Sequence, residues 1–118
     1  MKSHIEYLRH ILDEITFLLD KSQTLNKEDF LSDEVLKRAF VRSLEIIGEA
    51  ARKLPIDFRQ RYSQTDWRAI AGTRDKLIHD YLGVDYDIVW DIVTNKVHAL
   101  KIEIENIIAE ENQLEMSS

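Results

Sequence analysis

The segment RDKLIHDY, residues 74–81, places three side chains that could do chemistry close together. The imidazole of His79 can accept or donate a proton near neutral pH. The planar guanidinium of Arg74 can bind an anion through several hydrogen bonds at once, and Tyr81 adds a phenol hydroxyl. Together these side chains make the segment a candidate for acid–base chemistry on an anionic substrate.

Each of the three side chains also has an ordinary structural interpretation. Arg74 could be the cationic half of an ion pair between helices, and His79 a surface or packing histidine. Tyr81 could be an amphipathic residue just before a helix ends. Any one of them alone would favour the ordinary interpretation, whereas the three together, at the end of a stretch of positive charge, favour a site.

The segment is predicted to lie on one continuous helix, WRAIAGTRDKLIHDYL, with Asp66 as its N-cap and Gly83 after its end. Position 74 falls on the apolar stripe of that helix, although its residue is charged. The other members of the stripe are Trp67, Ile70, Ala71, Leu77, Ile78 and Tyr81.

Two pairings follow from this placement. A guanidinium directed at a core must be paired, because an unpaired buried charge is very costly, and Glu45 and Glu49 on the preceding helix are the candidate partners of Arg74. His79 lies off the stripe, one helical turn above Asp75. Asp75 is therefore predicted to accept a hydrogen bond from one ring nitrogen and to orient the other.

Charge is unevenly distributed along the chain. The net charge is −6, yet residues 37–76 hold ten basic and five acidic side chains and carry +5. An acidic protein with a basic middle can present one positive surface to a polyanion, although most of these side chains are expected on solvated helix faces. The basic residues are Lys37, Arg38, Arg42, Arg52, Lys53, Arg59, Arg61, Arg68, Arg74 and Lys76.

Apolar residues that recur at spacings of three and four predict further helices. The expected ranges are 3–21, a short turn at 28–31, 33–54, and a long helix that begins at Asp85 or Asp87. The sequence therefore predicts an all-α fold, an antiparallel bundle of four main helices plus short helical turns. The inward side of the 33–54 helix is expected to carry Val35, Leu36, Ala39, Phe40, Ser43, Leu44, Ile47, Ala50, Ala51 and Leu54.

Three residues mark the limits and the packing of the 33–54 helix. Ser32 is the expected N-cap, and Pro55 ends the helix because it cannot continue the hydrogen-bond pattern. Gly48 lies inside the helix, where glycine costs about 1 kcal/mol relative to alanine. It therefore indicates a place where another backbone or a bulky side chain comes close.

Length and composition limit the remaining possibilities. The 118 residues suit one domain, 1–118, with a tail that should fray from about residue 111. The chain has no cysteine, a charged N-terminal segment and no apolar run near the ~20 residues of a membrane span. His4 and His10 are too far apart to share a metal ion, and His98 stands alone. We expect a soluble, cytoplasmic protein without a metal or cofactor and without a membrane partner.

Three longer stretches resemble a known family. RDKLIHDYLGVDYDIVW is similar to the signature of the HEPN superfamily, in particular of its HepT-like toxin branch, in which an Arg, four residues, a His, one residue and a Tyr precede a GVD…VW segment. RAFVRSLEIIGEAARKLP looks like the family's second helix with its IGEA core, and WRAIAGTRDKLIH like the approach to the motif. The resemblance covers roughly residues 4–110. Thr73, where a larger apolar residue is expected, is the one departure.

The resemblance implies the toxin of a type VII-like toxin–antitoxin system, a homodimeric, metal-independent endoribonuclease that cuts RNA with two motifs in a shared cleft. Its partner would be an MNT-type nucleotidyltransferase antitoxin that transfers AMP to Tyr81. Arg74 and His79 would be catalytic, with Asp75 and Glu49 in support. The candidates for contacts to the RNA backbone are Lys76, Arg42, Arg38 and Arg68.

Two other classes of function stay open. The chain could be a non-catalytic nucleotide-binding or interaction module whose motif presents Tyr81 to a nucleotidyltransferase. It could also be a purely structural helical protein in which Arg74 pairs with Glu45 or Glu49. In that case removing Arg74 should cost several kcal/mol of stability, as expected for a stranded buried charge.

Overall fold

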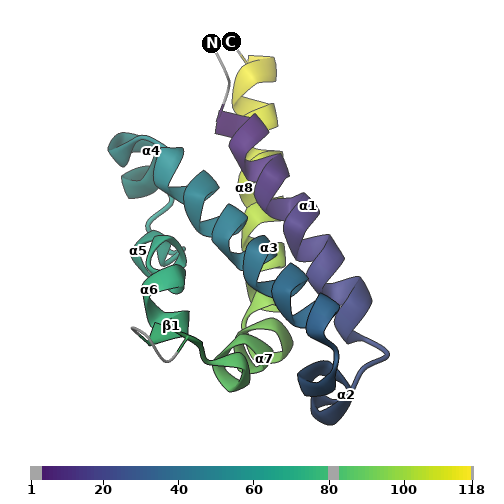
Figure 1. The fold of residues 1–118 in the computed structure, drawn as a ribbon. Helices are drawn as coiled ribbons and strands as arrows, with labels where there is room; N and C mark the ends of the chain where they lie inside the picture. Colours follow the sequence, from purple (N-terminus) through teal and green to yellow (C-terminus); the bar gives the residue numbers. More distant parts are fainter. Residues whose placement is uncertain (1–3, 80–82, 118) are drawn as a thin grey trace.

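The computed structural model describes residues 4–79 and 83–117, except for the side chain of His79. Helices dominate this part of the chain, which confirms the all-α prediction (Figure 1). The first half consists of α1 His4–Ser22, α2 Lys27–Ser32, α3 Glu34–Lys53 and α4 Ile56–Arg61. The second half consists of α5 Trp67–Ala71, α6 Thr73–Leu77, β1 Ile78–His79, β2 Gly83–Val84, α7 Tyr86–Asn95 and α8 Val97–Ser117.

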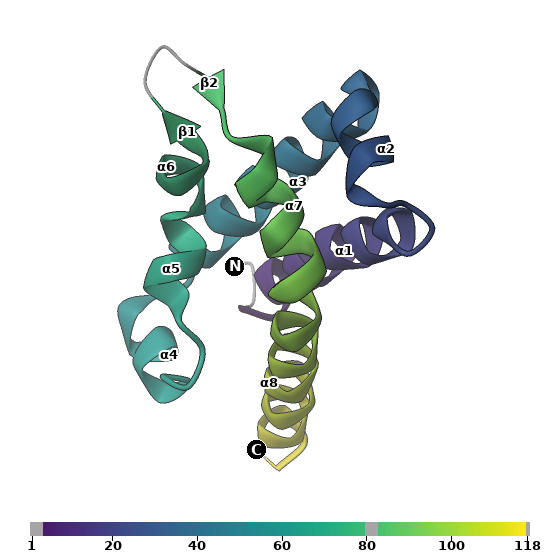
Figure 2. The ribbon, with the colours of Figure 1, turned by 90° about the horizontal axis from the view of Figure 1, so that it is seen from below.

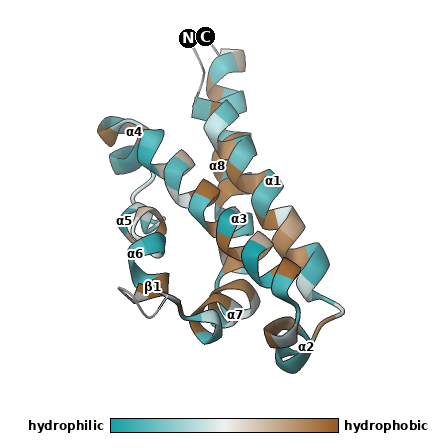
Figure 3. Ribbon diagram, viewed as in Figure 1, coloured by the Kyte–Doolittle hydropathy of each residue, from teal (hydrophilic) through white to brown (hydrophobic). Residues whose placement is uncertain are grey.

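The core lies between α1, α3, α7 and α8. α1 contributes buried apolar residues at spacings of three and four, namely Ile5, Leu8, Ile11, Ile15 and Leu18. α1 packs against both α3 and α8, while α4, α5 and α6 form a separate arm along α3 (Figures 1 and 2). Figure 3 shows hydrophobic and hydrophilic residues interspersed along α1 and α3, as expected for helices with one buried face.

Two details at the start of α3 differ from the prediction. Asp33, not Ser32, is the N-cap, because its Oδ1 accepts hydrogen bonds from the N–H groups of Val35 and Leu36. Ser32 instead ends α2, and its hydroxyl bonds back to carbonyls of that helix. Val35 was expected to face inward but is 77% exposed, whereas its neighbour Leu36 packs against the core.

The predicted continuous helix over residues 67–82 is wrong. α5 ends at Gly72, whose N–H bonds to Arg68 O, and α6 ends after Leu77. The chain then forms β1, in which Ile78 pairs with Val84 and His79 with Gly83. Gly83 has a φ of 87°, which only glycine adopts without strain, so the backbone can return and pair antiparallel.

The predicted long fourth helix is also divided. Asp85 caps α7, as expected, but α7 ends at Asn95 and α8 begins at Val97. Near the junction the Thr94 hydroxyl donates a hydrogen bond to the carbonyl oxygen of Trp90. Such bonds from a side chain to the backbone often bend helices. The bend gives α7 and α8 different directions (Figure 2).

The C-terminal tail was expected to fray from about residue 111, whereas α8 continues as a helix to Ser117. Arg61 donates two hydrogen bonds to the carboxylate of Glu111, at 3.1 and 2.9 Å, and Tyr62 donates its hydroxyl hydrogen to the same carboxylate. Burial and the nearby Glu111 carboxylate raise the pKa of Tyr62 to about 12. These contacts hold the tail of α8 against the end of α4.

Gly48 marks a close approach between helices, as predicted. A Cβ added to Gly48 would lie 3.1 Å from the carbonyl oxygen of Ile70, near the end of α5. A backbone oxygen cannot rotate away as a flexible side chain can. The missing side chain therefore lets α5 lie directly on α3.

We predict that Gly48→Val lowers the free energy of unfolding by about 1–3 kcal/mol, because the branched side chain overpacks the contact with α5. Arg38→Val is the matched control, since it places the same residue at an exposed position of the same helix. The control should cost less than about 1 kcal/mol. Equal losses for both variants in urea denaturation would contradict the close-packing explanation.

Candidate functional site

Arg74 lies on α6 and faces outward. Its side chain is 64% exposed, and its Nε lies 3.2 Å from Oε2 of Glu45, which is 24% exposed. The prediction that position 74 faces the core is wrong. The expected helix is interrupted at Gly72 and ends after Leu77, so Arg74 lies on a separate short helix. Leu77, three residues later, is the buried residue of α6. The expected pairing of Arg74 with a glutamate of α3 is confirmed, and the partner is Glu45.

Three residues on one face of α3 hold the segment that carries Arg74. Glu45 pairs with Arg74 itself, and Gly48 admits the backbone of Ile70. Arg52 donates a hydrogen bond from Nη2 to the carbonyl oxygen of Ala71. Their spacing of three and then four residues places them on the same side of the helix. α6 has only five residues, so these contacts fix its position.

Glu49 does not pair with Arg74 as the sequence had allowed. Its carboxylate lies 3.5 Å from Nη1 of Arg42, which is two helical turns earlier on the same helix. Glu49 nevertheless stays next to the arginine of the motif, because both line a hollow of about 280 Å³ between α3 and α6. A supporting role for Glu49 must therefore come through this hollow and not through direct contact with Arg74.

The other two residues of the motif are described only in part. The backbone of His79 lies in β1, paired with Gly83, and nothing is described of its side chain. Tyr81 lies outside the described residues. Asp75 is exposed on α6, but the prediction that it lies one helical turn below His79 is wrong, because the helix ends at Leu77.

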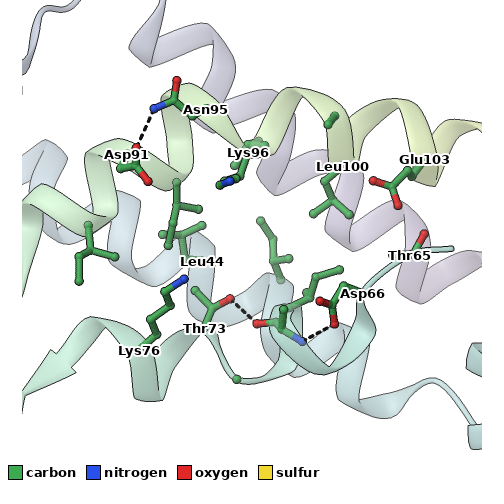
Figure 4. A pocket seen from close by; sticks show the side chains of 18 of the residues that line it. Leu44, Thr65, Asp66, Thr73, Lys76, Asp91, Asn95, Lys96, Leu100 and Glu103 are labelled. Atoms are coloured by element: carbon green, nitrogen blue, oxygen red, sulfur yellow. Dashed lines mark hydrogen bonds between the residues drawn. The ribbon is translucent and has the colours of Figure 1, made fainter. Parts of the chain in front are cut away.

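The four candidates for contacts to an RNA backbone do not form a single patch. Arg38 and Arg42 are exposed on α3, and Arg68 is exposed on α5. Lys76 lies on the opposite side of α6 from the hollow and lines a second, larger groove. Figure 4 shows its ammonium directed into that groove.

The larger groove was not predicted from the sequence. It has a volume of about 910 Å³ and lies between the α5–α6 arm on one side and α7 with the start of α8 on the other (Figure 4). Leu44, Ile92 and Leu100 are among its apolar residues, and Lys76, Lys96, Asp66 and Glu103 are among its charged ones. The sequence carries one indication of the groove. Residues 85–108 contain more isoleucines than one buried helix face can cover, and several of them are half-exposed.

Residues 4–79 and 83–117 contain neither a candidate membrane span nor a candidate metal site. No helix in this part of the chain is long and apolar enough to cross a membrane. Within the same residues, no three His, Asp or Glu side chains are grouped so that they could hold a metal ion.

Comparison with known proteins identifies the family. The model of the family described as "Ribonuclease HepT-like" matches residues 5–107. A "Putative RNase" of Caldanaerobacter subterraneus subsp. tengcongensis is 48% identical over 111 residues, which are 94% of this chain and 99% of that protein. A "Probable ribonuclease HepT" of Thermococcus cleftensis is 39% identical over 106 residues, or 90% and 96%. No solved structure matches the chain significantly. The chain belongs to the HepT-like ribonuclease family, which confirms the resemblance of its motifs.

We predict that Arg74→Ala changes the free energy of unfolding by less than about 1 kcal/mol, because Arg74 is 64% exposed and solvent screens its pair with Glu45. A purely structural role for a buried charge would instead give a loss of several kcal/mol. A double-mutant cycle with Glu45→Ala, measured by thermal or urea denaturation, isolates the energy of the pair. A loss of 3 kcal/mol or more in Arg74→Ala, on the scale of ~3–5 kcal/mol for a broken buried pair, would contradict the exposed-pair interpretation.

Proposed function

We propose that the chain is an endoribonuclease toxin that cleaves RNA without a metal ion, with Arg74 and His79 as its catalytic residues. The observation that carries the proposal is the presentation of Arg74. Glu45 engages the guanidinium at Nε, while the side chain remains 64% exposed. Its two terminal nitrogens are therefore available to bind the non-bridging oxygens of a phosphate.

RNA suits this set of residues because it supplies its own nucleophile. The 2′-oxygen attacks the neighbouring phosphorus, and the bond from phosphorus to the 5′-oxygen breaks. The products are a 2′,3′-cyclic phosphate and a free 5′-hydroxyl. One proton must leave the 2′-hydroxyl and one must reach the 5′-oxygen, and His79 can perform either transfer near neutral pH. Arg74 stabilises the negative charge that develops on the phosphate.

Other exposed arginines would extend the contact to the RNA backbone. Arg38 and Arg42 on α3 and Arg68 on α5 are exposed. Each such contact adds affinity that falls as salt concentration rises, because the phosphates release bound counterions. Lys76 is the weaker candidate, since it lines the groove on the other side of α6.

The proposal includes a two-fold dimer. Each chain carries one motif histidine, whereas cleavage needs one group that takes a proton and another that gives one. The groove beside α6 is where we place the second copy: it is open, has an apolar lining, and carries Lys76, Lys96 and Glu103. A two-fold contact pairs a surface with itself, which suits a rim with charges of both signs. Because α6 forms one wall of the groove, such a contact would place the α6 helices of the two chains beside the axis.

If the groove is the dimer contact, an arginine at each of two exposed alanines of α8 should affect the mass in solution differently. Ala99 is exposed and lines the groove, so Ala99→Arg should fill the groove and yield a monomer that no longer cleaves RNA. Ala109 is also exposed on α8 but does not line the groove, so Ala109→Arg should stay dimeric. Light scattering after gel filtration measures both masses. A dimeric Ala99→Arg would exclude the groove as the dimer contact.

The catalytic assignment predicts that His79→Ala abolishes cleavage while the fold and the mass in solution stay those of the wild type. The assay uses purified protein and labelled RNA in the presence of EDTA. The products of the wild type should end in 2′,3′-cyclic phosphate. Cleavage that His79→Ala retains would remove His79 from the mechanism, and cleavage that EDTA stops would refute metal independence.

The last part of the proposal concerns control by a partner. Tyr81 lies two residues after His79 in the sequence, and we propose that an MNT-type nucleotidyltransferase antitoxin transfers AMP from ATP to its hydroxyl, with release of pyrophosphate. The added phosphodiester anion would compete for Arg74 and repel RNA.

With ATP and the transferase, the mass of the chain should rise by whole AMP units and RNA cleavage should cease. Tyr81→Phe should gain no mass and keep its cleavage activity, and Tyr86→Phe is a control for the loss of a phenol outside the motif. Mass spectrometry of the intact protein measures the transfer. Transfer to a wild-type chain that never cleaves RNA would favour the alternative, a non-catalytic interaction module.

A further inference from the structure

The hollow beside Arg74 has the size and the lining of a site for a small polar ring. Its volume of about 280 Å³ lies just below the ~300–1,000 Å³ typical of sites for whole drug-sized ligands. It therefore suits one ring system and not an extended molecule. Its lining includes two carboxylates and two guanidiniums, those of Glu45, Glu49, Arg52 and Arg74.

All four of these charged groups have a partner, and the contact of Glu49 is longer than that of Glu45. Glu45 pairs with Arg74, and Arg52 donates to the carbonyl oxygen of Ala71. Glu49 has only its ion pair with Arg42 at 3.5 Å, it is 56% exposed, and it makes no side-chain hydrogen bond to the residues that the structure describes. Of the two carboxylates in the hollow, that of Glu49 is thus the more exposed and the less closely held, so it is the one that a ligand can reach.

A carboxylate accepts hydrogen bonds and donates none, so it selects a ring with donors on its edge. Guanine presents two adjacent donors, N1–H and the N2 amino group, which match the two oxygens of one carboxylate. Adenine and cytosine place one amino donor beside an acceptor nitrogen, and uracil places its N3–H between two carbonyls. In these three bases an acceptor would face a carboxylate oxygen and repel it.

We propose that the hollow binds a guanine of single-stranded RNA that flanks the phosphate on Arg74, and that Glu49 reads its N1–H and N2 amino edge. The inference rests on the proposed function, because Arg74 lines the hollow and holds the phosphate in that mechanism. A base next to this phosphate reaches the hollow without leaving the strand. The guanidinium of Arg52 is a planar group of the kind on which RNA bases stack. Glu49 is then a specificity-determining residue.

The test measures binding apart from cleavage. Short uridine oligonucleotides with 2′-O-methyl groups cannot be cut, and one position carries guanine, adenine or hypoxanthine, which keeps N1–H but lacks the amino group. Fluorescence anisotropy should show the wild-type chain binding the guanine oligonucleotide about tenfold more tightly than the adenine one, within the range of a bidentate base contact. The hypoxanthine oligonucleotide should fall between them. Glu49→Gln should abolish the preference, because an amide has one acceptor and one donor.

The matched control is Glu105→Gln, which removes an exposed carboxylate of α8 and should keep the preference. Equal binding of the three oligonucleotides by the wild type, or a guanine preference that Glu49→Gln retains, would overturn the inference. Free GMP that competes as well as the guanine oligonucleotide would overturn the assignment to RNA. Cleavage of unmodified RNA by the wild type is scored separately. Its absence would refute the proposed ribonuclease, while the binding result still decides the role of the hollow.

Discussion

The close approach of the α5 backbone to Gly48 is the constraint on which the candidate site depends. α6 has five residues, far fewer than the ~12–15 that an isolated helix needs for marginal stability in water. Its position therefore comes from α3, through the contact at Gly48 and the polar contacts of Glu45 and Arg52 on either side. A side chain at position 48 would move the end of α5 outward and would separate the two residues of the Arg74–Glu45 pair.

Hydrophobic periodicity predicted the helices whose buried faces are continuous. α1 and α3 were predicted almost to the residue because their apolar side chains recur over five turns against one core. The same periodicity failed over residues 67–79, where one continuous helix was expected but the backbone forms two short helices and then a strand. There the pairing of β1 with β2, permitted by the positive φ of Gly83, replaces helical hydrogen bonds. That pairing joins residues four and six positions apart, which a count of apolar spacings does not detect.

The sequence predicted which residues belong to the candidate site but not how they are arranged in space. The sequence restricted the partner of Arg74 to Glu45 or Glu49, which lie one turn apart on the same side of a helix. The choice between them depends on where α6 stops along α3, and that is set by the break at Gly72. The larger groove escaped prediction for a related reason. It exists because α7 and α8 diverge near Lys96, so apolar residues that a straight helix would cover stay open.

The placement of α6 between two hollows has a mechanical consequence. Arg74 faces the smaller hollow, while Thr73 and Lys76 of the same five-residue helix line the groove on the other side. A molecule seated in the groove would therefore contact the same short helix that carries Arg74. If that contact shifts α6, occupancy of the groove and the affinity of Arg74 for an anion are coupled, and each changes the other by the same factor.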